Sequence, residues 1–185
     1  MQNIFLVGPM GAGKTTIGKI LSQKLGFEFL DTDAVITARC GVEITTIFEI
    51  EGEAGFRERE AKLIDELTQL PSIVLSTGGG AVLNAQSRHH LLARGLVIYL
   101  CIHPQEQFKR TKGDRGRPLI QGNDPLGRLT ELFERRHPLY LEACDYICYP
   151  IGQNPQKIAN EIGLLHQSLQ EPLNSYTLPD WLHVK

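Results

Sequence analysis

The stretch Gly8-Pro9-Met10-Gly11-Ala12-Gly13-Lys14-Thr15 decides the fold of this chain. It fits the pattern GxxxxGK followed by Ser or Thr. The apolar run before it, residues 4–7, predicts a strand, and the amphipathic segment after it, residues 14–25, predicts a helix that ends at Gly26. This order is typical of a phosphate-binding loop, because glycines let consecutive backbone N–H groups face phosphate oxygens and the helix N-terminus adds positive charge.

The loop predicts a site for a nucleoside triphosphate with Mg²⁺. The Lys14 ammonium can reach the β- and γ-phosphates, and the Thr15 hydroxyl can ligate the metal. A GTPase would be expected to carry a guanine-recognition motif of the type NKxD, which the sequence lacks, so we favour a kinase of small molecules. The candidate nucleotide-binding residues of the loop are Gly11, Ala12, Gly13, Lys14, Thr15 and Thr16.

Short apolar runs alternate with longer amphipathic segments along the 185 residues. This alternation predicts parallel βαβ units and therefore an α/β fold, with helices on both faces of the sheet. The length predicts one domain, which we place at residues 1–170, with residues 171–185 as an extension to which we assign no chemistry. The expected strands are residues 4–7, 27–30, 73–75, 96–102 and 146–149, and the expected helices are residues 14–25, 53–70, 104–112, 126–136 and 155–169.

Composition and charge argue against several classes of protein. With 19 basic and 21 acidic residues the net charge is −2, which gives little support to nucleic-acid binding. The longest apolar run, residues 96–102, is too short to cross a bilayer, which takes about 20 residues. Residues 1–8 lack the basic start and the cleavage site of a signal peptide. We therefore expect a cytoplasmic protein without a membrane partner, whose four cysteines are reduced thiols. We also expect a monomer, although nothing in the composition bears on the oligomeric state.

Acidic and glycine-rich segments follow two further strands of the expected sheet. Leu30-Asp31-Thr32-Asp33 closes the second strand, and Ser76-Thr77-Gly78-Gly79-Gly80 follows the third. Ligands bind at the carboxyl ends of strands in an α/β sheet, so these segments are expected near the phosphates. Each also has a structural interpretation, since an aspartate suits the N-terminus of a helix beginning near Ala34 and three glycines suit a flexible turn. Because no aspartate ends the third strand, Asp31 is the candidate for the metal side.

Three arginines complete the candidate site. Arg57 stands at the start of a helix, and Arg136 belongs to Arg136-His137-Pro138-Leu139-Tyr140. Arg117 lies in residues 112–124, whose glycines and proline predict a long surface loop of the kind that often forms a lid. A guanidinium holds a carboxylate through two hydrogen bonds or stabilises a transferring phosphoryl group. Taken alone, each arginine is more often a solvated surface charge.

In combination, these motifs resemble the shikimate kinase family. The matching pieces are GPMGAGKT, LDTD, the FR of GFRERE, GGGA, RPL and the RxPLY pattern at 136–140. They occur in the family's order and at about its spacing, and the resemblance spans residues 4 to about 160. Many kinases share the phosphate-binding loop, whereas the joint occurrence of the other pieces is specific to this family.

The resemblance implies a fold and a reaction. The fold would be like that of nucleoside monophosphate kinases, with three layers, a five-stranded parallel sheet, a helical substrate-binding segment at about 32–62 and a mobile lid at about 112–124. The reaction would transfer a phosphoryl group from ATP, with Mg²⁺, to the 3-hydroxyl of shikimate. The product, shikimate 3-phosphate, would serve chorismate and aromatic amino-acid biosynthesis.

On the acceptor side, the resemblance assigns a role to each matching residue. Asp33 would hold the ring hydroxyls and would be the candidate base. Arg57 and Arg136 would bind the substrate carboxylate. The register against Pro138-Leu139-Tyr140 favours Arg136 over its neighbour Arg135. The residues bordering the substrate would be Gly78, Gly79 and Gly80, the second through its N–H, and the apolar walls would be Phe48 and Phe56.

On the nucleotide side, the resemblance places a cation on the lid. Arg117 would close from residues 112–124 onto the phosphates, and the RPL motif favours it over Arg115. Asp31 would bind Mg²⁺ through water. Arg110 would lie against the adenine, with the loop Gln153-Asn154-Pro155 on the other side of the base.

Two other functions stay open at this point. A kinase of another hydroxylated acid, such as gluconate, would share the loop and a carboxylate-binding arginine, but the DTD and GGG segments argue against it. A nucleotide-binding module without catalysis would be expected to have lost Lys14, Asp33 or the lid arginine, and all three residues are intact.

Overall fold

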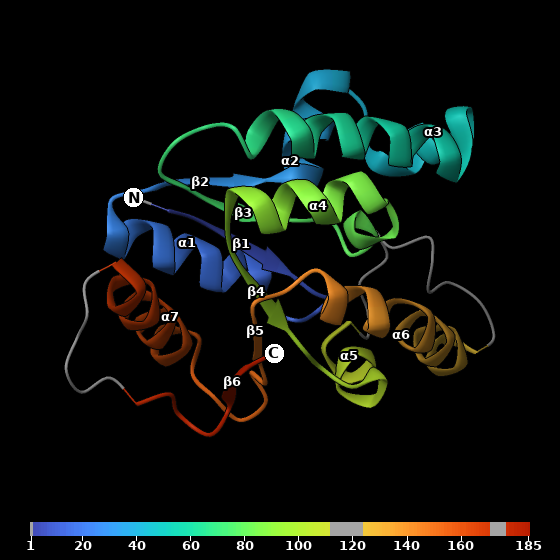
Figure 1. Cartoon of the computed structure of the whole chain (residues 1–185). Coiled ribbons are helices and arrows are strands. Elements are labelled where there is room, and N and C mark those ends of the chain that lie inside the picture. Colours follow the sequence, from blue (N-terminus) through green and yellow to red (C-terminus); the bar gives the residue numbers. More distant parts are fainter. Residues whose placement is uncertain (1, 112–123, 171–176) are drawn as a thin grey trace.

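The computed structural model describes residues 2–111, 124–170 and 177–185, and a single sheet runs through its centre (Figure 1). The strand order is β2-β3-β1-β4-β5-β6, and every neighbouring pair is parallel except β5 with β6. The predicted α/β fold is therefore confirmed. The strands are β1 (Asn3–Val7), β2 (Glu28–Asp31), β3 (Ile73–Ser76), β4 (Gly95–Leu100), β5 (Tyr146–Cys148) and β6 (Leu182–Val184).

The expected number of five strands is wrong, because the C-terminal segment adds a sixth. β6 runs antiparallel to β5, with Tyr146 opposite Val184, and the Tyr149 N–H donates to the Trp181 carbonyl at 2.8 Å. Without β6, the outer edge of β5 would expose unpaired N–H and C=O groups. Leu182 is 1% exposed and belongs to a hydrophobic cluster. The segment at 177–185 thus completes the sheet, a role that the sequence analysis did not assign to it.

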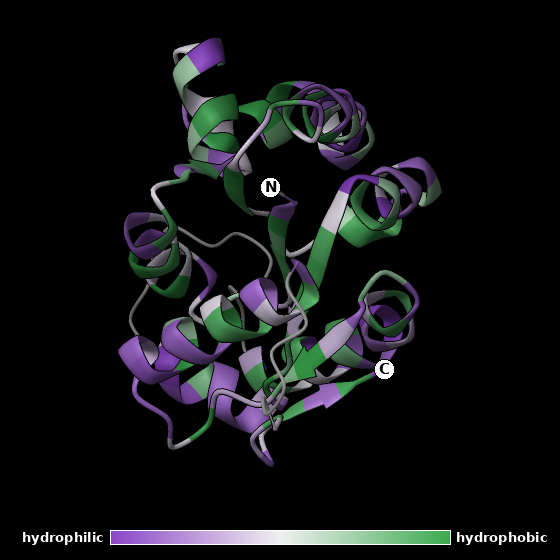
Figure 2. Ribbon diagram, turned by 60° about the vertical axis from the view of Figure 1, so that its left-hand side comes forward, coloured by the Kyte–Doolittle hydropathy of each residue, from purple (hydrophilic) through white to green (hydrophobic). Residues whose placement is uncertain are grey.

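Helices cover both faces of the sheet because successive strand residues point to opposite sides. In β1, Phe5 and Val7 pack into one hydrophobic cluster, and Ile4 and Leu6 pack into the other. Figure 2 shows hydrophobic strands passing between helices that each carry both hydrophobic and hydrophilic stretches. The helices are α1 (Lys14–Leu25), α2 (Thr32–Cys40), α3 (Ile44–Leu67), α4 (Ala85–Arg94), α5 (Pro104–Thr111), α6 (Pro125–Glu142) and α7 (Pro155–Gln170), with a 3₁₀ turn at Ala81–Leu83.

Three helices differ from the sequence expectation. α3 begins earlier, at Ile44, but Gly52 interrupts it with φ 72°, so the expected start at residue 53 marks the part after the kink. α4 was not predicted, and the Asn84 side chain caps it by accepting from the Ser87 N–H at 3.0 Å. α6 continues past residue 136 and through Pro138, although a proline removes one helical hydrogen bond. The buried Tyr140 fixes this last part of α6 against the core.

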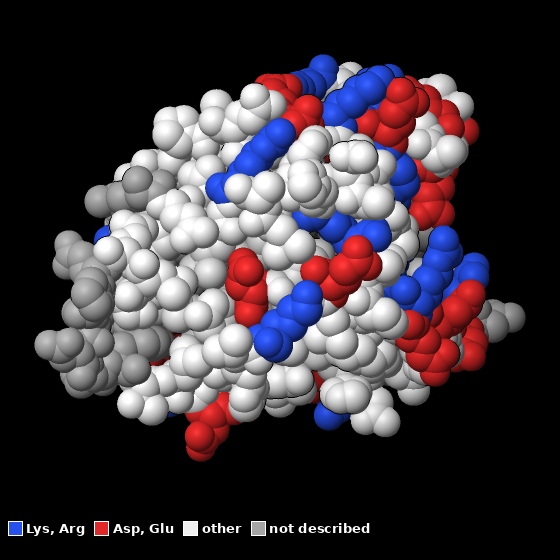
Figure 3. All heavy atoms as spheres, in the orientation of Figure 1, with Lys and Arg blue, Asp and Glu red and all other residues white. Residues whose placement is uncertain are grey.

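The surface drawn in Figure 3 carries mixed charge. Positive and negative side chains stand next to one another over α3 and α4. Ion pairs in this part of the chain include Arg39 of α2 with Glu66 of α3, and Arg94 of α4 with Asp65 of α3. Such pairs on an exposed surface add little to stability. Within the described ranges, no helix is both long and apolar enough to span a membrane.

Candidate active site

The phosphate-binding loop has the backbone that the glycines allow. Gly8, Gly11 and Gly13 have φ values of 143°, 76° and 94°, and α1 begins directly after Gly13. A side chain on Gly8 would meet the Leu100 carbonyl oxygen at 2.5 Å, so only glycine fits there. The Lys14 ammonium lies over the loop and donates to the Gly8 and Pro9 carbonyls at 2.7 and 2.9 Å. The loop is thus shaped for phosphate with its cation beside it.

Asp31 caps a helix and also contacts the phosphate-binding side of the cavity. Its Oδ1 accepts from the Asp33 and Ala34 N–H groups at 3.1 and 3.4 Å and caps α2, while its Oδ2 accepts from the Thr15 hydroxyl at 2.9 Å. One hydroxyl and one carboxylate oxygen lie side by side at the start of α1, and Mg²⁺ prefers such hard oxygen ligands. Among the residues that the structure describes, no cluster of three or more His, Cys, Asp or Glu could hold a metal. Mg²⁺ commonly takes one or two protein oxygens and completes its shell with phosphate and water.

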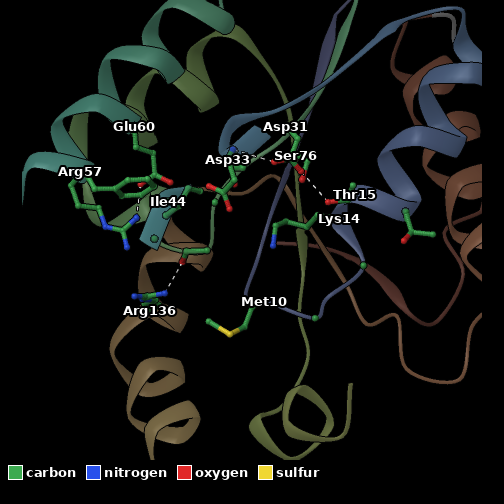
Figure 4. Close-up of a pocket in the computed structure, with 18 of the residues that line it drawn as sticks. Met10, Lys14, Thr15, Asp31, Asp33, Ile44, Arg57, Glu60, Ser76 and Arg136 are labelled. Carbon is green, nitrogen blue, oxygen red and sulfur yellow. Dashed lines mark hydrogen bonds and ion pairs between the residues drawn. The ribbon is translucent and has the colours of Figure 1, made fainter. Parts of the chain in front are cut away.

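A cavity of about 650 Å³ joins the loop to the acceptor side of the molecule. In Figure 4, Lys14 and Thr15 lie on one wall, Arg57 and Glu60 lie on the other, and Asp31 and Asp33 come from the segment between them. The lining residues expected from the sequence are Gly11, Gly13, Lys14, Thr15, Thr16, Asp31, Asp33, Phe48, Phe56, Arg57, Gly78, Gly79, Gly80, Arg110 and Arg136. The structure therefore gathers most of the predicted site around one space.

Arg57 is held by acids and rings of its own helix. Its Nη1 donates to Glu60 Oε2 at 2.6 Å, and its Nη2 donates to Glu53 Oε1 at 3.2 Å. The guanidinium carbon also lies 5.1 Å from the centre of the Phe56 ring and 5.9 Å from that of Phe48. These contacts restrict the guanidinium to the cavity wall, where it can bind an anion with little loss of freedom.

Glu60 is a site residue that the sequence analysis missed. It is 1% exposed, and its Oε1 lacks a hydrogen-bond partner among the described residues. A side chain on Gly78 would overlap Glu60 and Asp33, so this carboxylate faces the glycine segment. Burial raises the pKa of Glu60 more than the neighbouring Arg57 lowers it. Its position three residues after Arg57 was the available signal, since residues at i and i+3 share a helix face.

Arg136 reaches the cavity from α6. It is 6% exposed, its Nη1 donates to the Gly79 carbonyl at 3.1 Å, and burial lowers its pKa. Its Nε has no hydrogen-bond partner in the described part of the chain. The neighbouring Arg135 is exposed and does not line the cavity. The structure therefore places Arg136, the residue favoured by the RxPLY register, beside Gly79.

The remaining predicted residues are less fully placed. Arg110 lines the cavity and donates to the Gly11 carbonyl at 3.3 Å and to Glu106 at 2.9 Å. Gln153 does not line the cavity, and its N–H donates to the Pro150 carbonyl at 3.3 Å in the turn before α7. Ala12 is buried within the loop. Arg115, Arg117 and the predicted lid, up to residue 123, lie outside the described residues.

Comparison with known proteins gives the same family at three levels. The family model for shikimate kinase matches residues 10–165. The shikimate kinase of Actinobacillus succinogenes is 53% identical over 162 residues, which cover 87% of this chain and 93% of the relative. That of Nitrosococcus oceani is 49% identical over 183 residues, which cover 99% and 95%.

Solved structures agree with the sequence relatives. The shikimate kinase from Acinetobacter baumannii in complex with shikimate superimposes with a TM-score of 0.89 and 44% identity, covering 92% of this chain and 96% of that one. The enzyme from Aquifex aeolicus gives 0.77 and 31%, covering 91% and 98%. A gluconokinase from Sinorhizobium meliloti, at 16% identity and a TM-score of 0.58, shares the fold alone, with coverage of 95% and 98%.

Proposed function

Because this chain belongs to the shikimate kinase family, we propose that it transfers the γ-phosphoryl group of ATP to the 3-hydroxyl of shikimate, giving ADP and shikimate 3-phosphate. One observation carries the proposal. A single cavity has a phosphate-binding loop on one wall and two arginines, Arg57 and Arg136, on the other. Shikimate is a carboxylate that bears hydroxyl groups on its ring, so it presents an anion to the arginines and a nucleophile to the loop.

The nucleotide side accounts for ATP and Mg²⁺. The N–H groups at Gly11–Gly13 and the Lys14 ammonium would bind the β- and γ-phosphates. The Thr15 hydroxyl and Asp31, the latter through water, would hold Mg²⁺, which when bound neutralises phosphate charge. Arg110 borders the loop on the side of α5 and would contact the base, with Gln153 on the far side of that base.

The acceptor side accounts for both ends of shikimate. Arg57 and Arg136 would bind its carboxylate, each through charge-assisted hydrogen bonds. Glu60 Oε1, which has no hydrogen-bond partner among the described residues, and the Asp33 carboxylate face Gly78 and would accept hydrogen bonds from ring hydroxyls. Phe48 and Phe56 would cover the ring itself. The polar groups of the cavity thus match the two ends of the molecule, and the apolar groups match its middle.

The reaction needs positioning more than covalent chemistry. The oxygen of the acceptor hydroxyl would bond to the γ-phosphorus while the bond between that phosphorus and the β,γ-bridging oxygen breaks, leaving ADP. Asp33 would take the hydroxyl proton. Lys14, and Arg117 from the lid, would stabilise the charge on the transferring group.

We further propose that the protein works as a monomer in the cytoplasm, with these two small molecules as its partners and without nucleic acid or a membrane. This is supported by the composition of the site, because one chain supplies both the phosphate-binding loop and the two arginines that face it across the cavity. Light scattering coupled to size exclusion would measure the mass of the particle in solution, and a dimer would contradict the proposal.

The experiment that tests the function measures ADP release with Mg-ATP and a panel of acceptors: shikimate, quinate, gluconate and nucleoside monophosphates. We expect strong stimulation by shikimate. Stimulation by gluconate in its place would keep the phosphate chemistry and overturn the acceptor assignment. Binding of ATP without stimulation by any acceptor would indicate a nucleotide-binding module without catalysis.

A further inference from the structure

The Gly79 carbonyl receives two hydrogen bonds from α6. The Tyr140 hydroxyl donates to it at 2.6 Å, and Arg136 Nη1 donates at 3.1 Å. A carbonyl oxygen has two lone pairs, so these two donors fill its capacity. Residues 136 and 140 are one helical turn apart and share a face of α6. One face of the helix therefore fixes the middle of the glycine segment with two side chains.

Tyr140 is held in place independently of its hydroxyl. Its side chain is 1% exposed, and its ring stacks on that of Tyr99 with the centres 4.7 Å apart and the planes at 20°. Burial raises the pKa of Tyr140, so the phenol keeps its proton and acts as a donor. The packing of the ring would survive the loss of the hydroxyl, and the hydroxyl can therefore be tested alone.

Gly79, whose carbonyl receives these bonds, lies between the two walls of the cavity. A β-carbon built on Gly79 would lie 3.6 Å from the Met10 nitrogen in the phosphate-binding loop and 3.8 Å from Arg136 Nη1. Consecutive glycines have wide backbone freedom, so the peptide unit after Gly79 needs an external restraint to keep one orientation. The Arg136 guanidinium depends on that orientation, because its Nε has no hydrogen-bond partner in the described residues while its Nη1 bonds this carbonyl.

We propose that Tyr140 is a positioning residue for the acceptor: its hydroxyl fixes the Gly79 carbonyl, and the fixed carbonyl orients Arg136 toward the substrate carboxylate. The inference rests on the function proposed above and deepens it. Tyr140 does not touch the reacting atoms in this account and acts only through Gly79 and Arg136.

The first test compares Tyr140→Phe with Tyr99→Phe. Both variants remove one hydroxyl from the same ring stack, but that of Tyr99 lies 3.0 Å from His137 Nδ1 and not at Gly79. Loss of one hydrogen bond of ordinary strength predicts a rise of about three- to tenfold in the KM for shikimate in Tyr140→Phe. We expect the KM for ATP to stay near its wild-type value, and Tyr99→Phe to leave both constants nearly unchanged. An unchanged KM for shikimate, or equal changes in the two variants, would overturn the proposal.

A second test asks whether Tyr140 acts through Arg136. In an Arg136→Lys background the guanidinium is gone, so adding Tyr140→Phe should raise the KM for shikimate much less than it does in the wild type. Effects that multiply independently in the double variant would mean that the hydroxyl supports the fold in general and does not orient Arg136.

A third measurement needs no substrate and separates this inference from the proposed function. In ¹⁵N-labelled protein, Tyr140→Phe should broaden or shift the amide signals of Gly79 and Gly80, and Tyr99→Phe should leave them in place. If the wild type failed to phosphorylate shikimate, the proposed function would fall, while these signals would still show whether Tyr140 fixes the Gly79 peptide. Unmoved glycine signals in Tyr140→Phe would refute that restraint.

Discussion

The two walls of the cavity are built in different ways. The phosphate wall is mainly backbone, shaped by glycines at positive φ and followed at once by α1. The acceptor wall is mainly charged side chains, Arg57 and Glu60 from α3 and Arg136 from α6, which meet only in the folded chain. A backbone wall binds what every nucleotide has in common, its phosphates, whereas a side-chain wall can select one acceptor. The phosphate wall is accordingly recognisable from consecutive residues, and the acceptor wall is not.

The largest effect should come from Asp33, which lies where the two walls meet. Asp33→Asn keeps the size of the side chain and removes the proposed proton acceptor, so kcat should fall by about 10³-fold. ATP binding, measured by calorimetry, should stay nearly unchanged because the phosphate wall is intact. Weakened ATP binding with a normal maximal rate would contradict the role of Asp33 and would move it to the nucleotide side.

On the phosphate wall, Gly8→Ala should lower the free energy of unfolding by about 3 kcal/mol. The β-carbon of the alanine would meet the Leu100 carbonyl. The alanine would also have to adopt the φ of 143° that Gly8 has, which is unfavourable for a residue with a side chain. Gly41→Ala is the matched control, because Gly41 has φ 71° with nothing within 4 Å of an added carbon, and strain alone should cost about 1 kcal/mol. Urea unfolding measures both, and equal losses would show that the close approach to Leu100 is unimportant.

On the acceptor wall, Arg136→Ala should raise the KM for shikimate on the order of 10²-fold, because a charge-assisted bond to the carboxylate is lost. The KM for ATP should change little. Arg135→Ala provides the control, since Arg135 is exposed and outside the cavity. If Arg135→Ala had the larger effect in steady-state kinetics, the carboxylate would bind to that neighbour.

A smaller effect is expected for Glu60→Gln, which keeps the shape of the acceptor wall and removes a charge. The KM for shikimate should rise about tenfold, as expected for one hydrogen bond to a charged group. The thermal stability of the variant should match or exceed that of the wild type at neutral pH, because the buried carboxylate no longer has to be ionised.

The direction in which the pKa of Glu60 is shifted predicts how the stability difference between Glu60→Gln and the wild type depends on pH. The pKa of Glu60 is raised in the folded state, so folding favours the protonated form, and this group destabilises the protein increasingly as pH rises above the ordinary value of 4.5. The stability advantage of Glu60→Gln should therefore be absent at low pH and grow as the pH rises through the raised pKa. Thermal unfolding of both proteins over a series of pH values would check this, and an advantage that shrank with rising pH would show that the ion pair with Arg57 dominates.

The difference between the two walls also explains which parts of the structure could be predicted from the sequence. Features set by neighbouring residues were predicted, and features set by contacts between distant segments were not. The first helix was predicted with its bounds correct, because glycines at both ends and an amphipathic face are local signals. β6 and the end of α6 depend on partners distant in sequence, namely the open edge of β5 and the core around Tyr140. The spacing of Glu60 from Arg57 indicates a shared helix face, but only the fold shows that this acid is buried toward Gly78.

The docking of the C-terminal strand has a spectroscopic consequence. The chain has a single tryptophan, Trp181, which packs against the α1–α7 side of the sheet at the start of β6 and does not line the cavity. Its intrinsic fluorescence should therefore report the attachment of β6 to the sheet and should change little when ligands bind in the cavity. An unfolding curve followed by tryptophan emission that preceded the curve from far-ultraviolet circular dichroism would show that the sixth strand detaches before the rest of the sheet melts.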